Sequence, residues 1–132
     1  MKNKIEICLD NLKAQNKKAL ITYITAGCGG YEQTEEAVLA MEKAGADLIE
    51  IGVPFSDPIA EGPVIQAASL KALNRNTTLV GTFEMVKRLR EKTEMPLLLM
   101  LYINTIFRFT FNNIICIIIA IEHHIFFTII IA

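Results

Sequence analysis

The stretch AGADLIEIGVPFSDPIAEGPVIQ, residues 44–66, decides the fold of this chain. An apolar run, DLIEI at 47–51, gives way to a loop rich in proline, serine and aspartate. Such a short run closed by turn residues predicts a buried strand followed by a loop. Pro63 can begin the next helix, because its missing N–H is one of the groups left unpaired at a helix start.

The same alternation continues on both sides of this stretch. Further apolar runs predict strands over 19–25 and 97–103, and helical spacing of apolar residues predicts helices over 4–15, 32–44, 63–74 and 77–92. Strands that are apolar throughout are typical of a parallel sheet covered on both faces. The fold class is therefore α/β, either the first part of a (β/α)8 barrel or a doubly wound sheet.

Composition and charge exclude several classes of protein and site. A formal net charge of −1 gives no basic field for nucleic acid. Cys8, Cys28 and Cys116 contain no CxxC pair and indicate free thiols in a reducing compartment, and no signal peptide is visible, so we expect a cytoplasmic protein. His123 and His124 are adjacent and diverge in any regular structure, so we expect no metal site.

Polar side chains stand where the predicted strands end. Glu50 lies near the C-terminal end of a strand, where it is either a functional carboxylate or one half of a structural ion pair. Glu61, in the next loop, either acts in catalysis or stabilises the start of the following helix. Asp57 is by default a turn-forming acid. Tyr23 and Tyr102 each stand near a strand end, where tyrosines commonly pack their ring and hydrogen-bond their hydroxyl.

Residues 44–66 closely resemble the signature segment of the tryptophan synthase alpha subunit family. The motifs Thr25-Ala-Gly27, Phe83-Glu-Met-Val86 and Met100-Leu-Tyr-Ile-Asn104 also fall where that family has counterparts. The resemblance covers about Leu12 to Phe109. It implies a (β/α)8 TIM barrel that cleaves indole-3-glycerol phosphate to indole and glyceraldehyde 3-phosphate, a retro-aldol lyase reaction that needs no cofactor. We see no reason for other phosphate-binding barrels to share this segment.

The resemblance also implies roles for individual residues. Glu50 matches the strand-end glutamate that acts as general acid and base. Glu61 matches a loop carboxylate, usually aspartate, that stabilises charge on the indole ring. Tyr23, Met100 and Tyr102 match positions that line the substrate pocket.

A third group of matched residues implies a protein partner. Pro54, Asp57 and Pro58 resemble the segment that faces the beta subunit of the family's alpha2beta2 complex. That partner receives indole through a tunnel and holds the pyridoxal phosphate.

The resemblance ends near Phe109, and the composition changes there. Ten of the nineteen residues from Ile114 to Ala132 are isoleucine. We therefore divide the chain into a partial barrel, 1–109, and an apolar tail, 110–132, of unknown role. A frameshift in AT-rich DNA, a membrane-associating segment and a self-assembling segment are alternatives for the tail.

The division limits the expected activity. About three of eight barrel strands are expected, and the phosphate site of such barrels is usually built after strands seven and eight. We therefore expect this chain by itself to be inactive. The alternative is a non-catalytic fragment with an associating tail.

Overall fold

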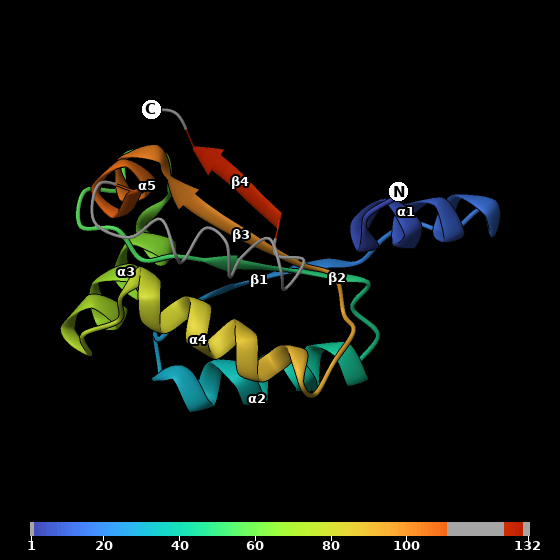
Figure 1. Cartoon of the computed structure of the whole chain (residues 1–132), viewed down its shortest axis with the longest axis horizontal. Helices are drawn as coiled ribbons and strands as arrows, with labels where there is room; N and C mark the ends of the chain where they lie inside the picture. Colours follow the sequence, from blue (N-terminus) through green and yellow to red (C-terminus); the bar gives the residue numbers. More distant parts are fainter. Residues whose placement is uncertain (1, 111–125, 131–132) are drawn as a thin grey trace.

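The computed structural model describes residues 2–110 and 126–130, with side chains described up to Ile106. Its elements alternate between helices and strands along the chain (Figure 1). They are α1 (Lys4–Ala14), β1 (Ile21–Thr25), α2 (Tyr31–Lys43), β2 (Leu48–Gly52), α3 (Pro63–Asn74), α4 (Leu79–Arg90), β3 (Leu97–Tyr102), α5 (Ile103–Thr110) and β4 (Phe126–Ile130).

The strands form one parallel sheet in the order β1-β2-β3-β4. The crossover helices α2 and α4 contact each other and lie on the same face of the sheet (Figure 1). A doubly wound sheet reverses its strand order and carries helices on both faces, whereas a barrel adds each strand beside the last with its helices outside. The arrangement is that of a barrel wall, which the apolar periodicity alone did not distinguish.

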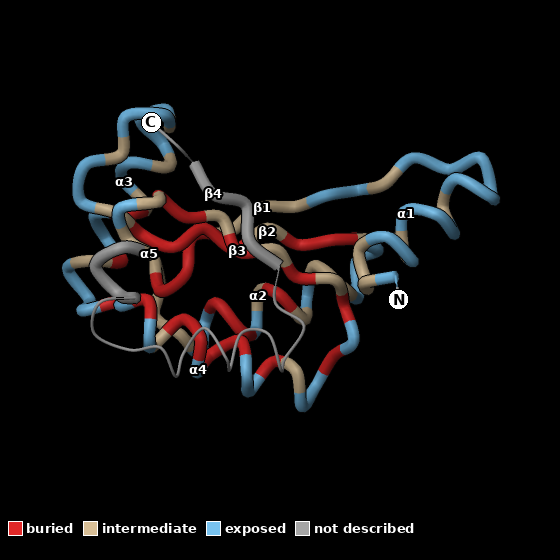
Figure 2. The backbone as a smooth tube through the Cα atoms, turned by 45° about the horizontal axis from the view of Figure 1, so that its top comes forward, coloured by how far each residue is buried: buried red, intermediate tan, exposed pale blue. Residues whose placement is uncertain are grey.

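The hydrophobic core lies between the sheet and the pair α2 and α4 (Figure 2). Alternate strand residues point to one face of a sheet. The face toward the helices carries aliphatic side chains with at most 1% exposure, namely Ile49, Ile51, Leu97, Leu99 and Leu101. They pack with Val38 of α2 and with the α4 residues Phe83, Val86 and Leu89.

The opposite face of the sheet, called the open face below, carries side chains that are only half-buried. Tyr23, Glu50 and Leu98 stand side by side on neighbouring strands, and all three are half-buried, as is Met100. The crossover helices α2 and α4 both lie on one side of the described sheet, so they cover only its first face. In a closed barrel this second face is the interior.

The tail contains an element that the sequence did not predict. β4 pairs with β3 in parallel register, with Leu98 opposite Phe126 and Tyr102 opposite Ile130. It adds a strand to the three expected, and its isoleucine-rich composition has the high strand propensity that suits this position. Cys116, His123 and His124 lie outside the described residues.

Most of the tail for which a membrane-associating role is an alternative, residues 111–125 and 131–132, lies outside the described residues. None of the helices within residues 2–110 and 126–130 is long and apolar enough to cross a membrane.

A buried ion-pair cluster joins α2 to α4. The carboxylate of Glu35, 8% exposed, pairs with Arg88 Nη2 at 2.6 Å and with Lys92 Nζ at 3.0 Å. Burial opposes ionisation of this carboxyl, but the hydrogen bonds from Lys92 and Arg88 outweigh it and lower the pKa of Glu35 below its usual 4.5. The cluster holds the C-terminal end of α4 against α2, and its partners are more than fifty residues apart in the sequence.

Replacing Glu35 with glutamine should lower the free energy of unfolding by about 1 to 2 kcal/mol at about pH 7. The loss is below that of a fully buried pair because both cationic partners are half-exposed. Since the folded-state pKa is lowered, the contribution is complete above the unfolded pKa and is lost as the pH falls through the folded value. Urea unfolding at about pH 7 and about pH 3 should show the difference shrinking at acid pH. The exposed Glu36→Gln is the matched control, and an equal loss for both variants would contradict the cluster's role.

Candidate active site

The C-terminal ends of β1, β2 and β3 meet the loop 53–62 and the helices α3 and α5 (Figure 1). In parallel α/β barrels the catalytic groups project from this edge of the sheet. The predicted residues Tyr23, Glu50, Glu61, Met100 and Tyr102 all lie on the strands or the loop that form this end.

Glu50 lies on the open face of β2. Its neighbours Ile49 and Ile51 are fully buried toward the helices, so alternation turns the carboxylate to the other side. In register with Glu50 stand Tyr23 on β1 and Leu98 on β3. None of the ion pairs formed within residues 2–106 includes Glu50, so the structural ion-pair interpretation gains no support there.

Tyr23 lies in the field of both candidate carboxylates. Its hydroxyl is 3.2 Å from Thr25 Oγ1. Burial raises the pKa of Tyr23, and the charges of Glu61 and Glu50 raise it further, while the Thr25 hydrogen bond opposes them. The two carboxylates therefore act on one phenol, although they are eleven positions apart in the chain.

Gly52 makes room for the Tyr23 ring at the end of β2. A Cβ atom at Gly52 would lie 2.0 Å from the Tyr23 hydroxyl oxygen and 2.7 Å from its Cζ. A glycine is therefore required here for close approach of a side chain.

Gly52→Ala should lower the free energy of unfolding by about 1 to 3 kcal/mol, because the tyrosine ring must leave its position. Gly62→Ala is the control, since a Cβ there meets nothing within 4 Å, and it should cost less than about 0.5 kcal/mol. In a Tyr23→Val background the Gly52 substitution should become nearly neutral in urea unfolding. A loss that persists without the ring would refute the steric explanation.

Glu61 is fixed by Tyr102, the last residue of β3. The Tyr102 hydroxyl donates a hydrogen bond to Glu61 Oε2 and accepts one from the Ala60 N–H at 3.0 Å. Burial raises the pKa of Tyr102, and the hydrogen bond with Glu61 raises it further. The Tyr102 ring stacks on Phe55 with centroids 4.7 Å apart and planes inclined by 25°.

The loop is also fastened from α3. Gln66 Nε2 donates to the backbone oxygens of Glu61 at 2.8 Å and Pro58 at 3.2 Å. Gly62 is the N-cap residue of α3, and no side chain caps this helix start. The Glu61 carboxylate instead accepts a hydrogen bond from the Tyr102 hydroxyl. Sequence reasoning missed Phe55 and Gln66, since neither carries a pattern that points to a site.

Met100 completes the open face near the strand ends. It stands in register with Gly52 and is half-buried, and its carbonyl oxygen accepts a hydrogen bond from the Val53 N–H at 2.9 Å. Met100 and Glu50 thus share one face of the sheet.

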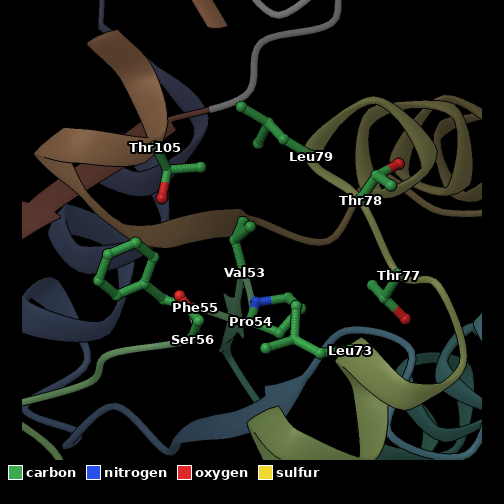
Figure 3. A pocket seen from close by; sticks show the side chains of 9 residues that line it. All are labelled: Val53, Pro54, Phe55, Ser56, Leu73, Thr77, Thr78, Leu79 and Thr105. Carbon is green, nitrogen blue, oxygen red and sulfur yellow. The ribbon is translucent and has the colours of Figure 1, made fainter. Parts of the chain in front are cut away.

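The three predicted partner-facing residues differ in their exposure. Pro54 is buried and lines a pocket of about 300 Å³ beside Leu73 and Leu79 (Figure 3). Asp57 is exposed and accepts a hydrogen bond from Ser56 Oγ at 2.6 Å. Pro58 is half-buried in a neighbouring pocket of about 420 Å³. Neither pocket is lined by Glu50 or Glu61.

Residues able to bind metal do not gather in the part of the chain that the structure describes. No group of three or more histidine, cysteine, aspartate or glutamate side chains lies close enough to hold an ion there. Cys8 and Cys28 are free thiols, as predicted.

Comparison with known proteins agrees with this geometry. Residues 9–125 match the family model described as tryptophan synthase alpha chain. The tryptophan synthase alpha chain of Alkaliphilus metalliredigens is 54% identical over 108 residues, 80% of this chain and 41% of that relative. The Caldanaerobacter subterraneus protein is 46% identical over 107 residues, 81% of this chain and 41% of its own length. The chain thus spans about two fifths of the relatives it matches.

Solved structures show the same relationship. The tryptophan synthase alpha subunit of Legionella pneumophila superposes with a TM-score of 0.87 at 37% identity, covering 95% of this chain and 47% of that one. A chain from the tryptophan synthase complex of Pyrococcus furiosus superposes with a TM-score of 0.68 at 31% identity, over 84% and 55% of the two chains. With its strand order, its strand-end carboxylates and these matches, this chain belongs to the tryptophan synthase alpha chain family.

Proposed function

We propose that this chain supplies the carboxylate half of a lyase site that cleaves indole-3-glycerol phosphate to indole and glyceraldehyde 3-phosphate. The observation that carries the proposal is that Glu50 on β2, in register with Tyr23, and Glu61, hydrogen-bonded by Tyr102 at the end of β3, lie at neighbouring strand ends of one sheet. A retro-aldol cleavage in tryptophan biosynthesis needs two such groups with different tasks.

Glu50 is suited to the proton transfers. Breaking the bond between indole C3 and the glycerol chain requires a proton on C3 and the loss of a proton from the glycerol hydroxyl. One carboxyl group can donate the first and accept the second, so protons balance over the cycle. No ion pair within residues 2–106 engages Glu50, which leaves its carboxyl available for both steps.

Glu61 is suited to charge stabilisation. Protonation at C3 places positive charge on the indole ring, and an ionised carboxylate near its N–H stabilises that charge selectively in the transition state. Tyr23 and Met100, on the same open face, would form walls for the flat ring.

The proposal concerns only part of a complete site. Barrel phosphate sites are usually built after strands seven and eight, and the described sheet has four strands. We therefore expect the 132-residue chain by itself to release little or no indole. The reaction as proposed uses no cofactor of this chain.

The proposal extends to a partner and a cellular location. Some matched structures are chains of a tryptophan synthase α2β2 complex. We propose a beta subunit as the partner of this chain too, with Pro54, Asp57 and Pro58 facing it and with pyridoxal phosphate held by the partner. We propose a cytoplasmic location.

The deciding experiment is a chimaera in which residues 12–109 of this chain replace the matching segment of the Alkaliphilus metalliredigens relative. Indole release from indole-3-glycerol phosphate is measured with and without beta subunit. We expect turnover by the chimaera and almost none by the 132-residue chain. A folded chimaera that releases no indole, beside an active parent, would overturn the proposal.

The alternative of a non-catalytic fragment with an associating tail has its own test. The chain with and without residues 110–132 is compared by light scattering and by sedimentation with lipid vesicles. Association that depends on the tail would favour the alternative, and identical behaviour would exclude it.

A further inference from the structure

We propose that Tyr102 is the positioning residue of the loop carboxylate: its hydroxyl holds Glu61 at the strand end and does not itself bind substrate. The role given to Glu61 rests on the proposed function above. The contact between Tyr102 and Glu61 stands on geometry alone. The proposal differs from the pocket-wall role that the family resemblance implies for Tyr102.

The hydroxyl of Tyr102 donates one hydrogen bond and accepts another within the protein. A phenol has one proton to donate, and here that proton goes to Glu61 Oε2. The oxygen also accepts the Ala60 N–H at 3.0 Å. A substrate group that accepted the hydroxyl proton would have to displace Glu61.

The Tyr102 ring is a firm support for these bonds. Tyr102 is 4% exposed and is the last residue of β3. Its ring stacks on the ring of Phe55. Phe55 belongs to the same loop as Ala60 and Glu61, so the loop touches one tyrosine through a ring, a backbone N–H and a carboxylate. A side chain on the sheet thus sets the position of a side chain on the loop.

The length of the Glu61 side chain fits this arrangement. Gln66 holds the Glu61 carbonyl from α3, and Tyr102 holds the preceding N–H from β3, so the backbone at this point is fastened on both sides. Aspartate here would be one methylene shorter, so from a backbone held in this way we expect its carboxylate to lose the hydroxyl. Glu61 and Tyr102 are therefore a matched pair in this chain.

The contact can be read directly by Raman spectroscopy of the full 132-residue chain, which has three tyrosines and no tryptophan. The tyrosine Fermi doublet reports whether a phenol is a strong hydrogen-bond donor. We expect the strong-donor component to disappear in Tyr102→Phe, in Glu61→Met and in Glu61→Asp. Exposed Glu84→Met is the matched control and should keep it. Retention of that component in Glu61→Met would overturn the proposal.

Hydrogen exchange supplies a second measurement at neutral pH. Tyr102→Phe keeps the ring and removes the acceptor of the Ala60 N–H, so exchange at Ala60 should accelerate on the order of 10-fold. Tyr31→Phe, which removes a hydroxyl bonded to Thr78 instead, should leave Ala60 unchanged. An unaltered Ala60 rate in Tyr102→Phe would also overturn the proposal. Neither measurement uses substrate, so absence of indole release would refute only the proposed function.

Discussion

Glu50→Gln should lower the rate of indole release by the active chimaera about 100- to 10,000-fold, the usual contribution of general acid–base catalysis. The amide keeps the shape of the carboxyl group and can neither accept the glycerol hydroxyl proton nor return one to the ring. Substrate affinity should change little, because the lost interaction belongs to the transition state. Steady-state kinetics of indole release separate the two quantities.

The matched control for this experiment is Glu36→Gln, an exposed glutamate of α2 away from the strand end. It should leave both kinetic constants unchanged. Circular dichroism of both variants should match that of the parent, since Glu50 takes part in no ion pair within residues 2–106. A fully active Glu50→Gln chimaera would remove Glu50 from the mechanism.

Ile51→Ala should lower the free energy of unfolding by about 2 to 5 kcal/mol. Ile51 is 0% exposed. It belongs to β2, which lies between β1 and β3, and it is part of the core beneath α2 and α4. Truncation removes apolar contacts and leaves a cavity that the flanking strands cannot easily close. Urea unfolding followed by circular dichroism measures the loss.

Two variants bracket this prediction. Ile51→Val removes one methylene and should cost about 0.5 to 1.5 kcal/mol. Val64→Ala, at a residue 81% exposed on α3, should change stability by less than about 0.5 kcal/mol. Equal losses for Ile51→Ala and Val64→Ala would mean that the core is not where the structure places it.

The sequence predicted those features that short-range chemistry controls. Pro63 begins α3 as expected. The strand holding Glu50 was predicted to within one residue, since its apolar run and its glycine boundary are local signals.

Features that depend on distant residues were not predictable in the same way. Tyr102 bonds Glu61 across 41 positions, and Glu35 reaches Arg88 across 53. No periodicity encodes such pairings, which exist only once the strands are in register. The placement of α2 and α4 on one side of the sheet likewise follows from crossover direction, which leaves no mark in composition.

The strand order has a consequence for how the chain acquires its structure. Each strand pairs with the next one along the chain, so β1 and β2 can associate before β3 exists as a folded element. Chains are made from the N-terminus at roughly 5–20 residues per second, slowly compared with the formation of local elements. The sheet can therefore grow strand by strand behind the ribosome, and the side chains around Glu50 meet early in synthesis.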